Sequence, residues 1–248
     1  MKKGFTIIEL LVAMGLFAAV IAAAGMIFNY SIESQRTAAA TAEIMRTLRA
    51  ITDQIDIDFQ SLRTDGYLIL YSEQVGSDNY DALYYFSTGD YQSWADTSTR
   101  SNIARIFLGH SQSTYTGKIL PGDLARDILL LVPGYTGTGN DVKNISFAEC
   151  QAAITNLENP NTAFFTTGRP PAGSTNIGSL FAQKVGSFRI EWTNGISGNR
   201  INWSSTAITC TPTSSNWPKA LKFTFTLYDS KRILKGGRTF EHIVYIGP

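Results

Sequence analysis

The chain has 248 residues, of which 44% are hydrophobic and 17% are charged, and this composition excludes a disordered chain, a collagen-like repeat and a small disulfide-held scaffold. Its 21 Lys and Arg nearly balance 20 Asp and Glu, so the net charge of +1 gives no electrostatic reason to expect nucleic acid as a partner. Two His and two Cys leave little material for a metal centre or a Cys–His nucleophile, and we expect neither an enzyme nor a cofactor.

The N-terminal segment joins two basic residues to a long apolar run. Lys2 and Lys3 come first, and residues 10–28 form a stretch of 19 residues without a charge. A helix of that length spans about 28 Å, close to the hydrocarbon thickness of a bilayer. By the positive-inside rule the N-terminus stays in the cytoplasm and the chain after this run lies outside it. The pattern predicts a single-pass inner-membrane protein.

A cleaved secretory signal and a simple signal anchor are alternatives for this segment. Residues 22–24 are three alanines before Gly25, which fits an ordinary signal peptidase site. Two features oppose cleavage there. A carboxylate such as that of Glu9 costs about 2.5–3.5 kcal/mol at the centre of a membrane helix, so it needs a partner. The helical pattern also continues well past Phe28.

The run Gly4-Phe5-Thr6-Ile7-Ile8-Glu9-Leu10-Leu11-Val12 resembles the leader and mature start of type IV pilins and pseudopilins. The resemblance implies that a prepilin peptidase cuts after Gly4 and that the new amine on Phe5 is methylated. That ammonium would lie about one helical turn from Glu9. A contact between the two, within or between subunits, would offset the cost of burying either charge, because a stranded buried charge costs about 3–5 kcal/mol. Glu9 and Phe5 are therefore the candidate assembly residues.

A second helical pattern follows the apolar run. Apolar residues recur every three or four positions at Ile44, Leu48, Ile51, Ile55, Phe59 and Leu62. The charged residues off this stripe are Arg46, Arg49, Asp53, Asp56 and Asp58. Asp65-Gly66 supplies a stop signal. The pattern predicts one helix over 5–62, apolar all round in its first half and amphipathic in its second. The helix-breaking proline of many pilins is absent, and Gly25-Met26 stands there.

Short β patterns fill the rest of the chain. The expected strands, each rich in aromatic or β-branched residues, are 67–71, 82–86, 103–108, 128–132, 187–192, 221–228 and 242–246. Ser146 and Glu149 form a capping-box pattern, which predicts one short helix ended by Pro160. Loops 134–141 and 159–177 are rich in turn-forming residues and are expected to be exposed. The fold class is α+β, with a long N-terminal helix packed on an antiparallel sheet, as in a pilin.

The expected organisation is a prepilin leader at 1–4, a transmembrane and filament-core helix at 5–30, an amphipathic stem at 31–65 and an extracytoplasmic β-rich head at 66–248. Three further pieces resemble J-type minor pseudopilins and W-type minor pilins: residues 47–50 with 58–63, the strand 185–192, and the hairpin entry 217–224 with the last strand 240–246.

This resemblance implies a minor subunit that initiates or caps a type IV pilus or a type II secretion pseudopilus. Its partners would be other minor pilins or pseudopilins, the major pilin, the prepilin peptidase and the inner membrane. The head would lie in the periplasm or outside the cell, and the subunit would enter the filament after assembly. The alternative is a membrane-anchored or secreted adhesin or binding domain without a filament role.

Two smaller features carry chemical predictions. Cys150 and Cys210 lie in the part expected outside the cytoplasm, where thiols oxidise, so a disulfide is expected and two unpaired thiols are the alternative. Residues 77–81 gather oxygen atoms around Asp78 and Asp81, which leaves a weak possibility of calcium. The segment lacks the Gly and terminal Glu of an EF-hand, so a solvated turn is the favoured interpretation and no metal site is expected.

Overall fold

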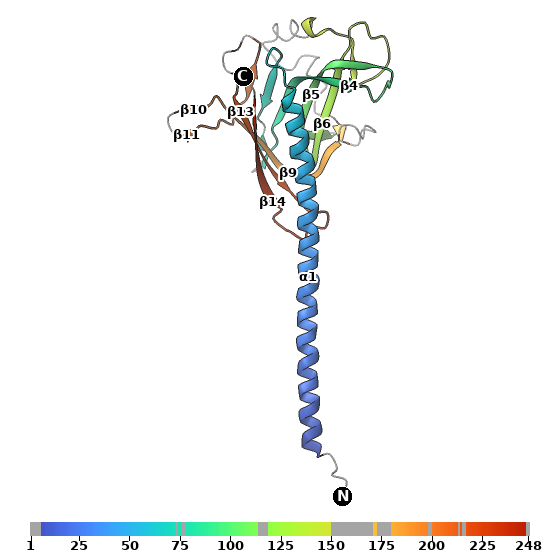
Figure 1. The fold of residues 1–248 in the computed structure, drawn as a ribbon, viewed down its shortest axis with the longest axis vertical. Helices are drawn as coiled ribbons and strands as arrows, with labels where there is room; N and C mark the ends of the chain where they lie inside the picture. The colour runs from blue at the N-terminus through green and yellow to red at the C-terminus, as the bar shows by residue number, and fades with distance from the viewer. Residues whose placement is uncertain are drawn as a thin grey trace.

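The molecule consists of one long helix and one β-sheet head at its C-terminal end (Figure 1). The computed structural model describes residues 6–72, 74–75, 78–113, 119–149, 171–172, 180–197, 200–212, 214 and 217–246. The N-terminus and the head lie at opposite ends of the long axis (Figure 1). This shape separates a free rod from a packed head.

Helix α1 (Ile7–Gln60) is continuous over 54 residues and about 81 Å. It begins at the N-cap Thr6 and ends at the C-cap Ser61. No break occurs at Gly25, because glycine keeps its backbone N–H and weakens a helix far less than proline does. The continuous helix predicted from the sequence is confirmed to within two residues at each end.

Fourteen strands follow the helix within the residues that the structure describes. They are β1 (Leu68–Tyr71), β2 (Gln74–Val75), β3 (Asp78–Asn79), β4 (Ala82–Gln92), β5 (Arg100–Ser113), β6 (Ile119–Leu131), β7 (Val142–Lys143), β8 (Pro171–Ala172), β9 (Leu180–Thr193), β10 (Ile196–Ser197), β11 (Arg200–Ile201), β12 (Ile208–Cys210), β13 (Ala220–Leu227) and β14 (Arg238–Tyr245). All seven strands predicted from the sequence are present. The first halves of β6 and β9 were not predicted.

The main sheet has the strand order β12-β1-β4-β5-β6-β9-β13-β14, and β7 and β8 pair with its middle strands. Neighbours along this path are antiparallel, whereas the two-residue strands β7 and β8 pair in parallel with β6 and β5. The sheet curls around the upper part of α1 (Figure 1). The α+β fold class and the antiparallel head are confirmed.

The core lies on both faces of this sheet. On the helix side, Ile51, Ile55 and Phe59 are buried against Phe188 and Phe223. The larger part of the second core consists of aromatic residues on the other face: Tyr67, Tyr84, Phe86 and Phe107, with Phe147 packed against them. Because both faces are covered, residues 82–87 of β4 are all buried and show no alternation of exposure. The apolar stripe predicted on the helix is therefore the attachment of the stem to the head.

The expectations for three loops need correction or a limit. Asp141, in the predicted loop 134–141, is buried and accepts hydrogen bonds from Ser93 Oγ at 2.9 Å and from the Trp94 N–H at 2.8 Å. Most of 159–177 lies outside the described residues. The capping box at Ser146 and Glu149 is present, and 147–149 are helical, but the rest of the predicted helix lies outside the described residues.

Candidate assembly surfaces

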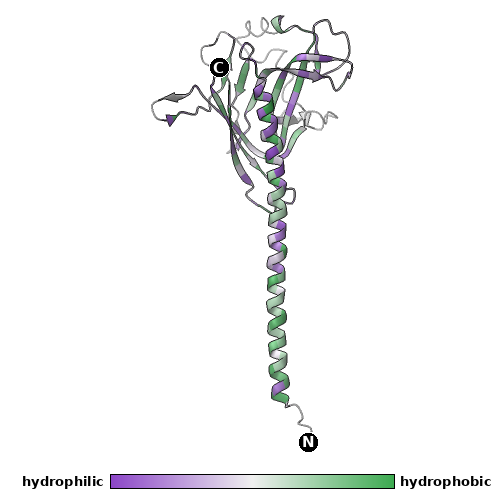
Figure 2. Ribbon diagram, viewed as in Figure 1, coloured by the Kyte–Doolittle hydropathy of each residue, from purple (hydrophilic) through white to green (hydrophobic). Residues whose placement is uncertain are grey.

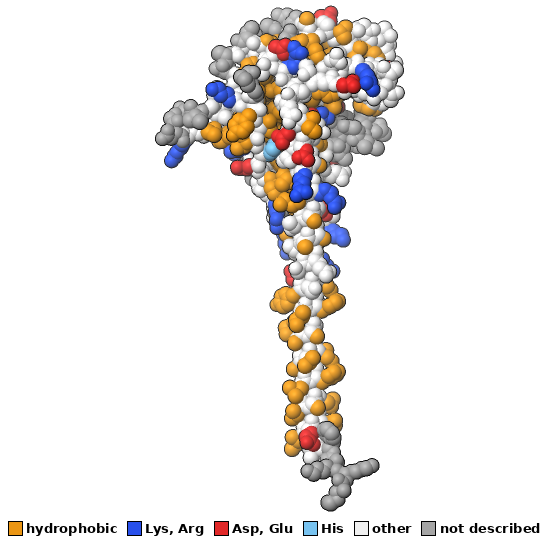
Figure 3. Space-filling model, in the orientation of Figure 1, with side chains coloured by type: hydrophobic (Ala, Val, Ile, Leu, Met, Phe, Trp, Pro, Cys, Tyr) orange, Lys and Arg blue, Asp and Glu red, His pale blue; other side chains and the backbone are white. Residues whose placement is uncertain are grey.

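The first half of α1 stands free of the head and is apolar on all sides (Figures 2 and 3). Its large apolar side chains between Ile7 and Tyr30 are 56–79% exposed. By length and composition this helix could cross a membrane. Leaving so many apolar side chains in water is unfavourable by about 1.5–3 kcal/mol each, so this surface requires lipid or the apolar helices of neighbours.

Glu9 is tied to the start of this helix by a capping box. Its carboxylate accepts hydrogen bonds from the Thr6 backbone N–H at 3.0 Å and from Thr6 Oγ1 at 2.9 Å, and its own N–H donates to Thr6 Oγ1 at 3.3 Å. The carboxylate is therefore turned back toward the N-terminus, where the helix dipole favours a negative charge. The pattern Thr-x-x-Glu, which has the same spacing as Ser146 and Glu149, indicates this box from the sequence, but the box was not among the predicted features.

The predicted processing residues, Gly4 and Phe5, lie outside the described residues. The structure places their neighbour Thr6 at the N-cap, one residue after Phe5. A cut after Gly4 would thus leave a chain whose new amine is a single residue away from the cap. The contact between Glu9 and that amine stays a prediction.

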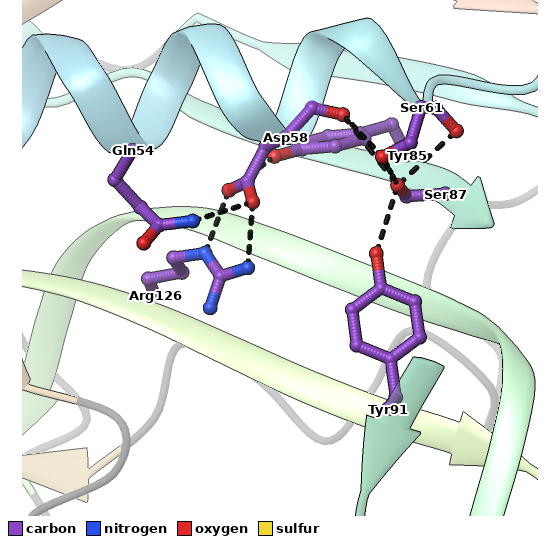
Figure 4. A network of polar contacts seen from close by, with 7 residues as sticks. All are labelled: Gln54, Asp58, Ser61, Tyr85, Ser87, Tyr91 and Arg126. Carbon is purple, nitrogen blue, oxygen red and sulfur yellow. Dashed lines mark hydrogen bonds and ion pairs between the residues drawn. The ribbon is translucent and has the colours of Figure 1, made fainter. Parts of the chain in front are cut away.

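The second surface is the junction of stem and head, built around Asp58 (Figure 4). Arg126 on β6 binds it with two hydrogen bonds, Nε to Oδ2 at 2.6 Å and Nη2 to Oδ1 at 2.7 Å. Gln54 Nε2 and the Tyr85 hydroxyl donate to the same carboxylate at 2.9 and 3.1 Å. The side chains of Asp58 and Arg126 are only 5% and 15% exposed. Four donated hydrogen bonds therefore satisfy a buried charge.

Protonation follows from this arrangement. Burial, together with the charge of Asp58, raises the pKa of the Tyr85 phenol well above its usual value, so it stays neutral and donates its proton. Burial opposes the charge of Arg126, but the hydrogen bonds and the charge of Asp58 outweigh it and raise the pKa of the guanidinium. Our prediction that Asp58 belongs to the polar face of the stem is therefore wrong. The helical wheel could not reveal a buried arginine on a strand 68 residues away.

Hydroxyl groups extend the junction from this ion pair. Ser61 and Ser87 share a hydrogen bond at 2.6 Å between their Oγ atoms, and the Tyr91 hydroxyl donates to Ser87 Oγ at 2.9 Å (Figure 4). Backbone N–H groups on either side complete the pairing, from Arg63 to the carbonyl of Phe86 and from Thr88 to that of Ser61, both at 2.9 Å. These hydrogen bonds fix the end of α1 against β4.

Two further contacts hold the stem lower down. His242 Nε2 on β14 lies 2.8 Å from Asp56 Oδ1. Glu43 accepts hydrogen bonds from the backbone N–H and the hydroxyl of Ser230, both at 3.0 Å. Ser230 belongs to the loop between β13 and β14. The head therefore grips α1 from residue 43 to its end.

One family model matches the chain, that of the prokaryotic N-terminal methylation motif, over residues 1–25. This is the prepilin leader of type IV pilins, and it precedes a long apolar helix packed on a curled antiparallel sheet. The chain therefore carries the type IV prepilin motif on a pilin-like fold. Comparison with curated proteins and with solved structures gives no match. The motif implies processing by a prepilin peptidase and membrane assembly with other pilins.

The two chemical predictions for the pilin-like head have different outcomes. Cys210 is 1% exposed on β12, while Cys150 lies outside the described residues, so their disulfide stays a prediction. Asp81 is fully buried and accepts a hydrogen bond from the Ile190 N–H at 2.7 Å, so the expected solvated turn is wrong there. Asp78 is exposed on β3. Among the described residues, no group of three or more His, Cys, Asp or Glu could hold a metal.

Proposed function

We propose that this pilin-like protein is a minor subunit that initiates or caps assembly of a type IV pilus or a type II secretion pseudopilus. We further propose that its role is structural and not enzymatic. The observation that carries the proposal is the free half of α1, apolar on all sides, with one capped carboxylate at its start and the methylation motif around it. A helix of this kind can leave the bilayer only by entering another apolar environment, such as a bundle of like helices.

In the proposed mechanism, Glu9 sets the axial position of each subunit in the bundle of helices. After cleavage behind Gly4, the amine of Phe5 and the Glu9 carboxylate would lie at the same end of the helix. In a bundle, an unpaired carboxylate among apolar helices is strongly unfavourable, so a subunit in the wrong axial position would leave it stranded. The head, which packs on α1 from Glu43 onward, then presents its outer surface to neighbouring heads.

The first test is the start of the mature protein. Intact mass and N-terminal sequencing of protein from cells with the prepilin peptidase should give a chain that begins at methylated Phe5. A chain that begins at Gly25 would contradict the proposal and favour a secreted binding domain.

The second test separates charge from capping at Glu9. Glu9→Gln keeps an oxygen that accepts the Thr6 hydrogen bonds but removes the charge, whereas Thr6→Val removes the side-chain bonds and keeps the charge. We expect Glu9→Gln, but not Thr6→Val, to reduce co-purification with sheared filaments about tenfold or more, since a stranded partner charge costs at least 3 kcal/mol. Both variants should remain in the membrane fraction. Normal entry of Glu9→Gln would contradict the register mechanism, and absence of the wild-type chain from filaments would favour an anchored adhesin.

A further inference from the structure

The lower end of the head, where it faces the apolar half of α1, carries a group of exposed cations. We call this group the basic collar: Arg36, Lys184, Lys231, Arg232 and Lys235. Figure 3 shows Lys and Arg side chains gathered around the helix at this level. Lys184, Arg232 and Lys235 line one hollow of about 540 Å³, and Arg36 and Lys231 line a second hollow beside the helix.

Several arginines higher in the head are neutralised by ion pairs, whereas the collar cations, like Lys143, Arg200 and Lys219 elsewhere in the head, have no ion-pair partner among the described residues. Arg63, Arg100, Arg105, Arg126 and Arg189 each form an ion pair with an Asp or Glu. Asp78, Asp123 and Asp229 also line the larger hollow, and Glu43 and Asp229 line the second, so the five cations of the collar lie beside four acids and keep an excess of one positive charge.

The loop that carries three of these cations has a fixed shape. Asp229 accepts hydrogen bonds from the backbone N–H groups of Lys231, Ile233 and Leu234 at 3.2, 2.8 and 3.0 Å. These bonds fix the carboxylate inside the loop, where it keeps its negative charge beside the collar cations. Glu43 is likewise occupied by Ser230, which anchors the loop to α1. The loop therefore holds these three cations in fixed positions beside α1.

The height of the collar matches the surface of a membrane. Arg36 lies eight residues after Phe28, which is about 12 Å along the helix, and Glu43 lies about 22 Å along it. The headgroup layer extends about 5–8 Å beyond the hydrocarbon core. Arg36 is then within about one Debye length, 8 Å at physiological salt, of the headgroups, and the loop anchored at Glu43 lies about 10 Å farther along the helix axis. Tyr30, 72% exposed, stands at the interface, where aromatic residues are enriched.

We infer that the basic collar binds the anionic phospholipid headgroups of the membrane that holds α1, so that the unassembled subunit rests with its head on the bilayer. This inference rests on the membrane anchoring in the proposed function but not on filament assembly. The attraction is electrostatic and short-ranged, so it is lost when the subunit is drawn out of the bilayer. This attraction would hold unassembled subunits with α1 upright in the bilayer, and it would be lost when a subunit is extracted.

The test uses the full chain in lipid vesicles. Gly236→Cys places a fluorophore in the collar loop, where an added side chain meets no atom within 4 Å. Vesicles of phosphatidylcholine are compared with vesicles in which a quarter of the lipid is phosphatidylglycerol, both with a nitroxide on some headgroups. We expect stronger quenching in the anionic vesicles, and loss of the difference at 1 M salt, where the Debye length is about 3 Å.

The matched variants change three charges each. K231Q/R232Q/K235Q should weaken the lipid-dependent quenching by about fivefold for each cation removed. K143Q/R200Q/K219Q, which alters exposed cations elsewhere in the head, should leave it unchanged. Equal quenching in both vesicles, or equal losses in both variants, would overturn the inference. A collar variant that keeps its lipid response but fails to enter filaments would also overturn the inference, because the collar would then bind an acidic surface of a neighbouring subunit.

Flotation with the vesicles separates this inference from the proposed function. A chain that floats and responds to anionic lipid supports the collar even if Glu9→Gln enters filaments normally. A chain that floats with neither vesicle overturns the anchor and the collar together.

Discussion

The two halves of α1 share one unbroken backbone but have opposite surroundings. The half from Ile7 to Tyr30 stands free of the described part of the head, whereas the half from Glu43 onward buries a stripe of side chains and one charged carboxylate in the head. Helix formation is therefore not what distinguishes them. The first half obtains its stability from a surrounding that the chain itself does not supply, and the second half obtains it from the sheet.

The largest effect expected from this comparison is at the buried ion pair. Asp58→Ala should reduce the free energy of unfolding of the head by about 3–5 kcal/mol, because it leaves Arg126 charged and buried without a partner. Chemical denaturation of the full chain in detergent, followed by near-ultraviolet circular dichroism, measures this. Asp53→Ala, on the exposed side of the same stem, should change it by less than about 0.5 kcal/mol. Equal losses in the two variants would mean that the junction is not the anchor of the head.

A pair of identical truncations compares the two halves directly. Ile51→Ala, at a side chain with no exposure, should reduce the stability of the head by about 2–4 kcal/mol through lost burial and a cavity. Ile21→Ala, at a side chain 56% exposed, should leave head unfolding unchanged in the same assay. A destabilising effect of Ile21→Ala on the head would show that the free half has contacts with it.

The collar loop predicts a smaller, pH-dependent effect. Burial alone would raise the pKa of Asp229, but hydrogen bonds from the N–H groups of Ile233, Leu234 and Lys231 outweigh it and lower that pKa. Its stabilising contribution is thus complete above the usual carboxyl pKa of about 3.9 and is lost as the pH falls through the lower folded value. Hydrogen exchange of residues 228–237 should accelerate in that acid range in the wild type, and at neutral pH in Asp229→Ala. A wild-type loop that stays equally protected once the Asp229 carboxyl is protonated would contradict this role.

The smallest effect is expected at the edge of the junction. Asp56 is 46% exposed and its contact with His242 is open to solvent, so Asp56→Asn should cost about 0.5 kcal/mol or less. The same denaturation assay applies. A loss of stability as large as that of Asp58→Ala would mean that the contact between Asp56 and His242 also holds the head on the stem.

Much of the fold could be predicted because it follows local patterns. The apolar run, the stripe from Ile44 to Leu62 and the strand at β13 each depend on residues a few positions apart, and these elements are present, although the helix itself ends at Gln60. The assembly end of the helix was also within reach, since Thr6 and Glu9 form a capping box that spacing alone predicts. The limits of β6 and β9 were missed because their first halves are held by pairing with each other, and pairing between distant segments leaves no local pattern in the sequence.

The sequence by itself determined that the chain has a long apolar helix, unfavourable in water, and a β-rich head. Hydrophobic periodicity and turn-forming residues are local patterns, so they can be recognised in the sequence. Only the tertiary structure decided that Asp58 is buried, that Asp81 and Asp141 face inward, and that five cations from three separate segments meet at the lower end of the head. The reason is physical. A charge is buried or grouped by partners that are distant in sequence, and the energy of such long-range pairing has no local signature.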